Sequence, residues 1–195
     1  DPDQFVASIL DGQPEPPAYF ARMKRENRTG PTVLGGLPKP SQCTVDSIPA
    51  GSAIIDTRPW ETFRNGHLPG SYSNVPEKSF STVAGAFTDP DQTIVLVADP
   101  GDVEEAVRML IRVGLDRVLH WVDARDLESQ SGLLTTQELD VAKIHAMDDA
   151  VILDVRNASE FAEGHIPGAT NVSYVQLAKR MSEVPTGQAI YVNCR

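Results

Sequence analysis

The chain has 195 residues, of which 41% are hydrophobic and 23% are charged, and its formal net charge is −10. This length and composition suit one or two folded domains with hydrophobic cores. A surface that acidic repels phosphate backbones, so we expect no nucleic-acid partner. No apolar run approaches the roughly 18–20 residues of a membrane-spanning helix, so we expect no membrane segment.

Cysteine and histidine usage restricts the chemistry further. The two cysteines, Cys43 and Cys194, make no disulfide framework, and the polar start of the chain is unlike a secretory signal. We therefore expect a reduced, cytoplasmic protein. The four histidines lack metal-ligand spacings such as His-x-His, so we expect neither a metal nor a cofactor in this chain. Because the chain does not begin with methionine, we do not expect Asp1 to be the natural start.

In chain order, a proline-rich segment at residues 1–40 comes before an internal repeat. Residues 53–71 (AIIDTRPWETFRNGHLPGS) align without a gap with residues 151–169 (VILDVRNASEFAEGHIPGA). The identical pairs include Asp56/Asp154, Arg58/Arg156, Phe63/Phe161, Gly66/Gly164, His67/His165, Pro69/Pro167 and Gly70/Gly168. A match of this extent indicates two duplicated domains.

Both copies have the same predicted order of elements. A short apolar run, 53–55 or 151–153, predicts a strand buried on both faces, as in a parallel sheet. The Asp-x-Arg that follows lies at the carboxyl end of this strand, where α/β sheets bind their ligands. A short amphipathic helix comes next, with Ser159 as a candidate cap in the second copy. The Gly-His-x-Pro-Gly sequence then predicts a rigid turn.

A second buried strand follows in each copy. In the first copy it covers residues 93–99 and ends at Asp99, and in the second copy it covers residues 188–194 and ends at Cys194. Aligning the ends of these strands places Asp99 where the later copy has Cys194.

The first copy continues beyond its second strand. Apolar spacing predicts a helix over residues 103–111, with Asp102 and Glu105 as a capping box, and residues 117–122 read as another strand. Strand, loop, helix and strand make a βαβ unit. The sequence therefore predicts an α/β fold in which each domain surrounds a parallel sheet.

These motifs resemble those of the rhodanese family. The sequence ILDVRNASEFAEGHIPGATNV, followed by YVNCR, is closely similar to that family, and IIDTRPWETFRNGHLPGS is similar to a degenerate member. The resemblance implies a small α/β fold and a cysteine that takes up sulfane sulfur as a persulfide. It also implies two small-molecule partners, an anionic sulfur donor and a thiol acceptor.

Residues 1–40 resemble the C-terminal tail of metallo-β-lactamase-fold proteins of the persulfide dioxygenase and glyoxalase II kind. The implied domains are this tail and a linker at 1–40, a degenerate rhodanese domain at 41–127, and the N-terminal part of a second rhodanese domain at 128–195. A metal ion is expected only in the lactamase-fold domain upstream, which would be a further partner. A homo-oligomer is left open.

Sulfur transfer requires a thiolate, because a neutral thiol is a poor nucleophile. Cys194 is the predicted nucleophile, since a strand tip that leads to a helix start offers free N–H groups and a positive dipole end. Arg195 adds a positive charge beside it. The alternative is that Cys194 is a small buried hydrophobic residue.

The supporting residues have two interpretations each. Asp154 and Arg156 either pair to fix the loop or set the charge near Cys194, and His165 either stabilises the turn or acts in acid–base chemistry. Their counterparts Asp56 and Arg58 persist in a copy without a cysteine, which favours structural roles. Because the carboxylate of Asp99 cannot accept sulfane sulfur, we expect the first domain to be catalytically silent.

We therefore predict a rhodanese-type sulfurtransferase region from a sulfur-metabolism fusion protein. The alternative is a non-catalytic module that positions or oligomerises an upstream lactamase-fold hydrolase. A cysteine phosphatase of related fold needs an arginine six positions after the cysteine, and the immediate Cys-Arg favours sulfur transfer instead. Only the first two residues of the family's Cys-Arg-x-Gly-x-Arg loop are present, so we expect the chain as it stands to be inactive.

Overall fold

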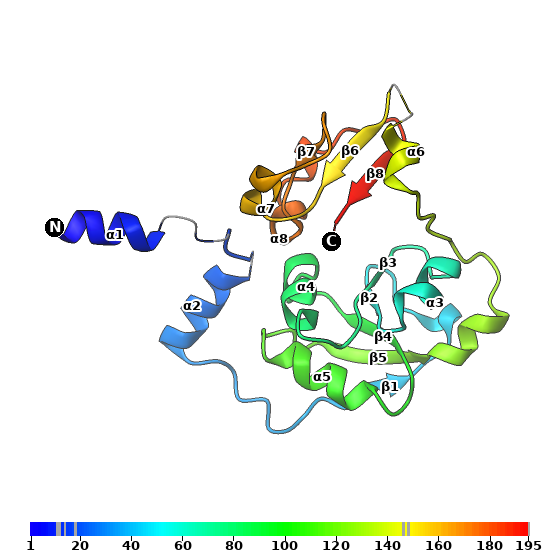
Figure 1. Ribbon diagram of the computed structural model, residues 1–195. Coiled ribbons are helices and arrows are strands. Elements are labelled where there is room, and N and C mark those ends of the chain that lie inside the picture. Colours follow the sequence, from blue (N-terminus) through cyan, green and yellow to red (C-terminus); the bar gives the residue numbers. More distant parts are fainter. Residues whose placement is uncertain (11–12, 14, 18, 146, 148, 195) are drawn as a thin grey trace. The chain divides into compact units, whose positions relative to one another are not determined.

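The computed structural model describes residues 1–10, 13, 15–17, 19–145, 147 and 149–194, and Figure 1 shows its helices and strands. The chain divides into two compact units. The first-copy unit spans residues 19–138, and the second-copy unit combines residues 139–195 with residues 1–18. The first sheet has five strands and the second has three, and every strand pair is parallel. The predicted α/β fold with parallel sheets is confirmed.

The first-copy unit has the strand order β1-β5-β4-β2-β3. Its elements are α2 (Phe20–Thr29), β1 (Ser41–Gln42), η1 (Val45–Ser47), β2 (Ala53–Asp56), α3 (Trp60–Asn65), β3 (Ser71–Ser73), α4 (Phe80–Phe87), β4 (Ile94–Ala98), α5 (Val103–Ile111), β5 (Val118–Asp123) and η2 (Ala124–Ser129). The central strand β4 is buried along its whole length. Its run of five apolar residues therefore has the composition that a strand covered on both faces requires.

Each face of this sheet has its own apolar cluster, because successive strand residues point to opposite faces. Ile94, Leu96 and Ala98 of β4 face a cluster that includes the inner sides of α4 and α5. Val95 and Val97 face a second cluster that contains Leu68 and residues of η2. The apolar face predicted for residues 103–111 is the face with which α5 packs on the sheet.

Helix α2 is fixed to the first-copy unit at two points. The guanidinium group of Arg22 donates hydrogen bonds to the carbonyl oxygens of Gly114, at 2.5 Å, and of Val113. These carbonyls lie just beyond the end of α5, where helix carbonyls lack partners and a cation is favoured. The ring of Tyr19 covers Gly85 of α4 so closely that a Cβ on this glycine would lie 2.5 Å from the ring.

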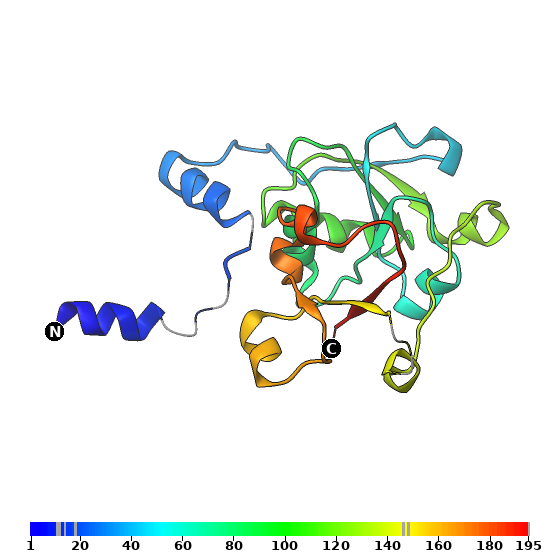
Figure 2. The same ribbon diagram turned by 90° about the horizontal axis from the view of Figure 1, so that it is seen from above.

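The second-copy unit has the strand order β7-β6-β8. Its elements are α1 (Pro2–Leu10), α6 (Val141–His145), β6 (Val151–Asp154), α7 (Ala158–Glu163), β7 (Thr170–Asn171), α8 (Tyr174–Leu177), η3 (Met181–Glu183) and β8 (Ile190–Asn193). Strands β6 and β8 run side by side in both views (Figures 1 and 2). Leu153, Val155 and Val172 form the buried centre of this smaller core.

Two local predictions about helix starts need correction. Asp102 is the N-cap of α5, but its side chain makes no capping hydrogen bond. Helix α7 is capped by Asn157, whose side chain accepts from the Glu160 amide, rather than by Ser159. Ser159 lies inside the first turn and donates to the Asn157 side chain instead. The described helices are all too short or too polar to cross a membrane.

Candidate active site at the end of strand β8

Asp154 and Arg156 form a clamp directly after β6. The carboxylate of Asp154 is fully buried and accepts from the Arg156 backbone N–H at 3.0 Å, from Nε at 3.0 Å and from Nη2 at 2.6 Å. Nη2 also donates to the carbonyl oxygen of Gly164 at 2.8 Å. The guanidinium group therefore ties the strand end to the turn that begins at Gly164. The two side chains thus form the pair that one of their two interpretations requires.

Hydrogen bonding keeps the buried carboxylate charged. Burial by itself raises the pKa of Asp154, but the hydrogen bonds from Arg156 and from the side chain of Asn193 outweigh it, and the net effect is a lowered pKa. The hydrogen bond to Asp154 is the main cause of a raised pKa at Arg156. Negative charge at Glu160 and at Cys194 adds to this effect. Arg156 is thus a permanent cation whose electrostatic environment includes the cysteine.

His165 is held in the turn by its own neighbours. Its ring stacks on Phe161 with a centroid distance of 3.8 Å, and its Nδ1 lies 2.9 Å from the Phe161 carbonyl oxygen. Because a carbonyl oxygen only accepts, Nδ1 carries the proton of this hydrogen bond. His67 makes the same two contacts with Phe63 in the first copy, at 4.0 Å and 2.9 Å. The shared geometry fits the turn-stabilising interpretation.

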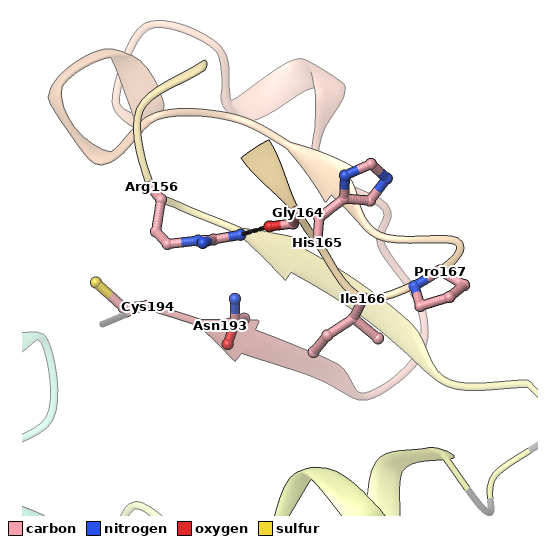
Figure 3. A pocket seen from close by; sticks show the side chains of 7 residues that line it. All are labelled: Arg156, Gly164, His165, Ile166, Pro167, Asn193 and Cys194. Carbon is pink, nitrogen blue, oxygen red and sulfur yellow. Dashed lines mark hydrogen bonds between the residues drawn. The ribbon is translucent and has the colours of Figure 1, made fainter. Parts of the chain in front are cut away.

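The side chain of Cys194 is exposed at the carboxyl end of β8. An open basin of about 380 Å³ lies there and is lined by Arg156, Gly164, His165, Ile166, Pro167, Asn193 and Cys194. Figure 3 shows the cysteine sulfur beside the Arg156 side chain, whereas the His165 ring points away from it. The alternative that Cys194 is a small buried hydrophobic residue disagrees with this exposure.

Two parts of the predicted site stay predictions. Arg195 lies outside the described residues, and so does the helix start expected after Cys194. Cys194, Arg156 and His165 all line the basin, and Asp154 is linked to it only through its hydrogen bonds with Arg156.

The second cysteine, Cys43, lies in the other unit, where burial raises the pKa of its thiol.

The first copy has the same clamp but no thiol. Asp56 is fully buried and accepts from Arg58 Nε at 2.9 Å and from Nη2 at 2.7 Å, and Nη2 also donates to the Gly66 carbonyl at 2.7 Å. The retention of this geometry in a copy without a cysteine indicates that the clamp serves the fold of the turn in both copies.

The strand register corrects one part of the sequence alignment. Asp56 lies opposite Val97 in the sheet, and Asp154 lies opposite Asn193. The position of Cys194 is therefore occupied by Ala98 in the first copy, and Asp99 corresponds to the next residue. The alignment by strand ends was one residue out, because β4 continues one residue beyond the partner of Asp56, to Ala98, whereas β8 ends at the partner of Asp154. Ala98 is fully buried and has no sulfur.

Two residues of the site, Asn193 and Asn171, were not predicted from the sequence. Asn193 donates from Nδ2 to Asp154 Oδ2 at 3.1 Å, and Asn171 donates to the carbonyl oxygens of Asp154 and Arg156 at 3.0 Å each. Alignment by sheet register would have shown that Asn193 replaces Val97 of the first copy.

A third Asp-x-Arg was also missed. Asp123 at the end of β5 accepts from Arg125 Nε at 2.9 Å and from Nη2 at 2.5 Å, and these hydrogen bonds lower the pKa of Asp123 to about 2. A search for the Asp-x-Arg spacing alone would have found it. The Asp-x-Arg pair therefore stabilises strand ends at three places in this chain and does not by itself identify an active site.

Within the part of the chain that the structure describes, no three His, Cys, Asp or Glu side chains come together as metal ligands would. What the site offers is an exposed thiol and a fixed guanidinium cation at the end of a parallel sheet. This arrangement defines a small α/β domain suited to anion binding and thiolate chemistry.

Comparison with known proteins gives the family. The model of the rhodanese-like domain matches residues 44–124 and 138–195, and the chain belongs to this family. The uncharacterized protein YqhL of Bacillus subtilis (strain 168) is 41% identical over 46 residues, which are 24% of this chain and 36% of that protein. The chain thus spans about a third of the length of this curated relative.

Two solved structures that match the chain differ in how well they superpose on it. A metallo-beta-lactamase from Staphylococcus aureus subsp. aureus COL matches with a TM-score of 0.55 at 24% identity, over 63% of this chain and 35% of that one. A thiosulfate sulfurtransferase from Pseudomonas aeruginosa matches with a TM-score of 0.32 at 22% identity, over 73% of this chain and 30% of that one. The chain covers about a third of each of these proteins.

Proposed function

We propose that this chain is a rhodanese-type sulfurtransferase region in which Cys194 carries sulfane sulfur as a persulfide. The Cys194 thiolate attacks the outer sulfur of an anionic donor such as thiosulfate. The new S–S bond forms as the donor's S–S bond breaks, and sulfite leaves with the electron pair. An acceptor thiolate then attacks the terminal sulfur of the persulfide, and its new S–S bond releases the Cys194 thiolate.

The observation that carries this proposal is the exposed Cys194 sulfur beside the Arg156 guanidinium in an open basin. A fixed cation favours the thiolate over the thiol and attracts an anionic donor. Membership in the rhodanese-like domain family supports the same chemistry. Ala98 in the corresponding position of the first copy supports the proposal that this copy is catalytically silent, since a methyl group cannot accept sulfur.

Incubation of the full-length protein with thiosulfate tests this function. We expect intact-protein and peptide mass spectrometry to find the mass of one added sulfur atom on Cys194, and cyanide to remove it as thiocyanate. Cys43→Ser should keep this uptake, and Cys194→Ser should abolish it. Undiminished thiocyanate formation by the Cys194→Ser protein would overturn the proposal.

A second candidate is a non-catalytic module that positions a lactamase-fold hydrolase in a fusion protein. It is favoured by the fold similarity to the Staphylococcus aureus metallo-beta-lactamase and by the first copy, which keeps a complete sheet without a nucleophile. The two candidates predict different effects of Cys194→Ser in the full-length protein. Loss of sulfur uptake with unchanged assembly supports the enzyme. Unchanged sulfur turnover, with loss of assembly only after removal of residues 41–195, supports the module.

A further inference from the structure

Asn193 distinguishes the copy with a thiol from the copy without one. The two copies share the Asp-x-Arg clamp, the stacked histidine and the hydrogen bond to a glycine carbonyl. At the residue opposite the clamp aspartate they differ, with Val97 in the first copy and Asn193 in the second. The next residue differs as well, with Ala98 and Cys194. The amide therefore accompanies the cysteine.

The amide adds one hydrogen bond to a carboxylate that already has its arginine partner. Its Nδ2 lies 3.1 Å from Asp154 Oδ2, and a carboxylate that pairs with arginine only accepts, so the amide nitrogen is the donor. Asp56 forms its clamp with Arg58 at nearly the same distances while the apolar Val97 lies opposite. The clamp therefore forms without such an amide, and the fold of the turn does not account for Asn193.

The amide can act on the cysteine through two intermediates. A hydrogen bond to Oδ2 restricts rotation of the Asp154 carboxylate, and the fork of arginine follows the plane of the carboxylate that it binds. Arg156 connects the carboxylate to the cysteine, because its guanidinium group is held by Asp154 and Arg156 lines the same basin as Cys194. The other charged or titratable groups in the described surroundings are His165, on the basin wall, and Glu160, which acts on Arg156.

We propose that Asn193 is a positioning residue that holds the Asp154 carboxylate, and through it the Arg156 guanidinium, in the orientation that presents positive charge to the Cys194 sulfur. This inference rests on the proposed function of Cys194. It assigns to Asn193 no contact with the reacting atoms. The anion that benefits from the orientation is the thiolate, the persulfide or the donor.

Alkylation of Cys194 by two reagents of similar size tests this role without sulfur transfer. Iodoacetate is an anion and iodoacetamide is neutral, so the ratio of their rates reports the positive charge beside the sulfur. In Asn193→Val, which copies the first domain, we expect the ratio to fall by about three-fold or more, the change that one ordinary hydrogen bond supplies. Asn193→Asp should lower it further, because it replaces the donor with a second negative charge.

Two variants serve as references. Val192→Asn places an amide on the neighbouring residue of the same strand, whose side chain is 63% exposed and points to the opposite face, and it should leave the ratio unchanged. Arg156→Gln removes the cation and sets the lower limit of the ratio. Equal falls in both reagents' rates, with an unchanged ratio in Asn193→Val, would overturn the proposal.

The alkylation result is independent of the sulfur-transfer result. If Cys194 takes up no sulfur but the ratio falls in Asn193→Val, the proposed function fails and the positioning role stands. If Cys194 takes up sulfur and the ratio does not change, the positioning role fails alone. Circular dichroism of Asn193→Val verifies that the variant is folded before its ratio is interpreted.

Discussion

Replacing Arg58 by methionine should destabilise the first-copy unit strongly. Asp56 is fully buried, Arg58 is 10% exposed, and their closest nitrogen and oxygen atoms are 2.7 Å apart. The substitution removes every side-chain donor of Arg58 to Asp56 and also the donor to the Gly66 carbonyl. Breaking a buried pair from one side costs about 3–5 kcal/mol, because the remaining charge is left without a partner.

The two tryptophans make this loss measurable in one unit. Trp60 and Trp121 both lie in the first-copy unit, so the fluorescence change in a urea titration reports the unfolding of that unit. We expect the free energy of unfolding in Arg58→Met to fall by about 3–5 kcal/mol. The addition of Asp56→Asn should recover part of the loss, because it removes the unpaired charge.

Arg108→Met is the matched control. Arg108 pairs with Glu104 at 2.6 Å, but these side chains are 51% and 69% exposed, so the pair contributes about 0–1 kcal/mol. A fall of less than about 1 kcal/mol in Arg58→Met, similar to the control, would refute the reasoning from burial. It would mean that water reaches Asp56 once the arginine is removed.

Three further outcomes follow from the first-copy unit. Burial raises the pKa of Tyr72 to about 12, above the unfolded value near 10, so this phenol contributes stability that is complete below pH 10 and is lost as the pH rises to about 12. Tyr72→Phe should remove that part of the alkaline loss in urea titrations, and an unchanged pH dependence would contradict it. Gly85→Ala should cost about 1–3 kcal/mol, because the new Cβ would overlap the Tyr19 ring, and it should cost nothing further in a protein that already carries Tyr19→Ala. In Ala98→Cys combined with Cys194→Ser, the new thiol should resist iodoacetamide in the folded protein, because position 98 is fully buried, and rapid labelling at that position would show that the end of β4 is accessible.

Strands and helices could be predicted from the sequence where a local pattern of apolar residues is typical of only one kind of element. The apolar runs at 53–55 and 151–153 became β2 and β6, and the helix predicted at residues 103–111 has those bounds as α5. The pairing of Asp154 with Arg156 was one of two interpretations that the sequence left open, and the structure contains that pair. These features are local and depend little on the rest of the chain.

The register between strands could not be obtained in the same way. An apolar run shows that a strand is present, but it does not show where the strand ends relative to the neighbour with which it pairs. This is why Asp99 was aligned with Cys194, although Ala98 holds that position. Asn193 was missed for the same reason, since its importance appears only when it is compared with Val97.

The anchoring of α2 bears on how the chain can be dissected. A fragment that starts at Ser41 would lack the Tyr19 ring over α4 and the guanidinium that closes the end of α5. The backbone carbonyls of Val113 and Gly114, and the surface of α4 at Gly85, would then be exposed to solvent. Laboratories that express the first rhodanese-like unit alone should begin upstream of Tyr19, and the shorter fragment is expected to melt at a lower temperature.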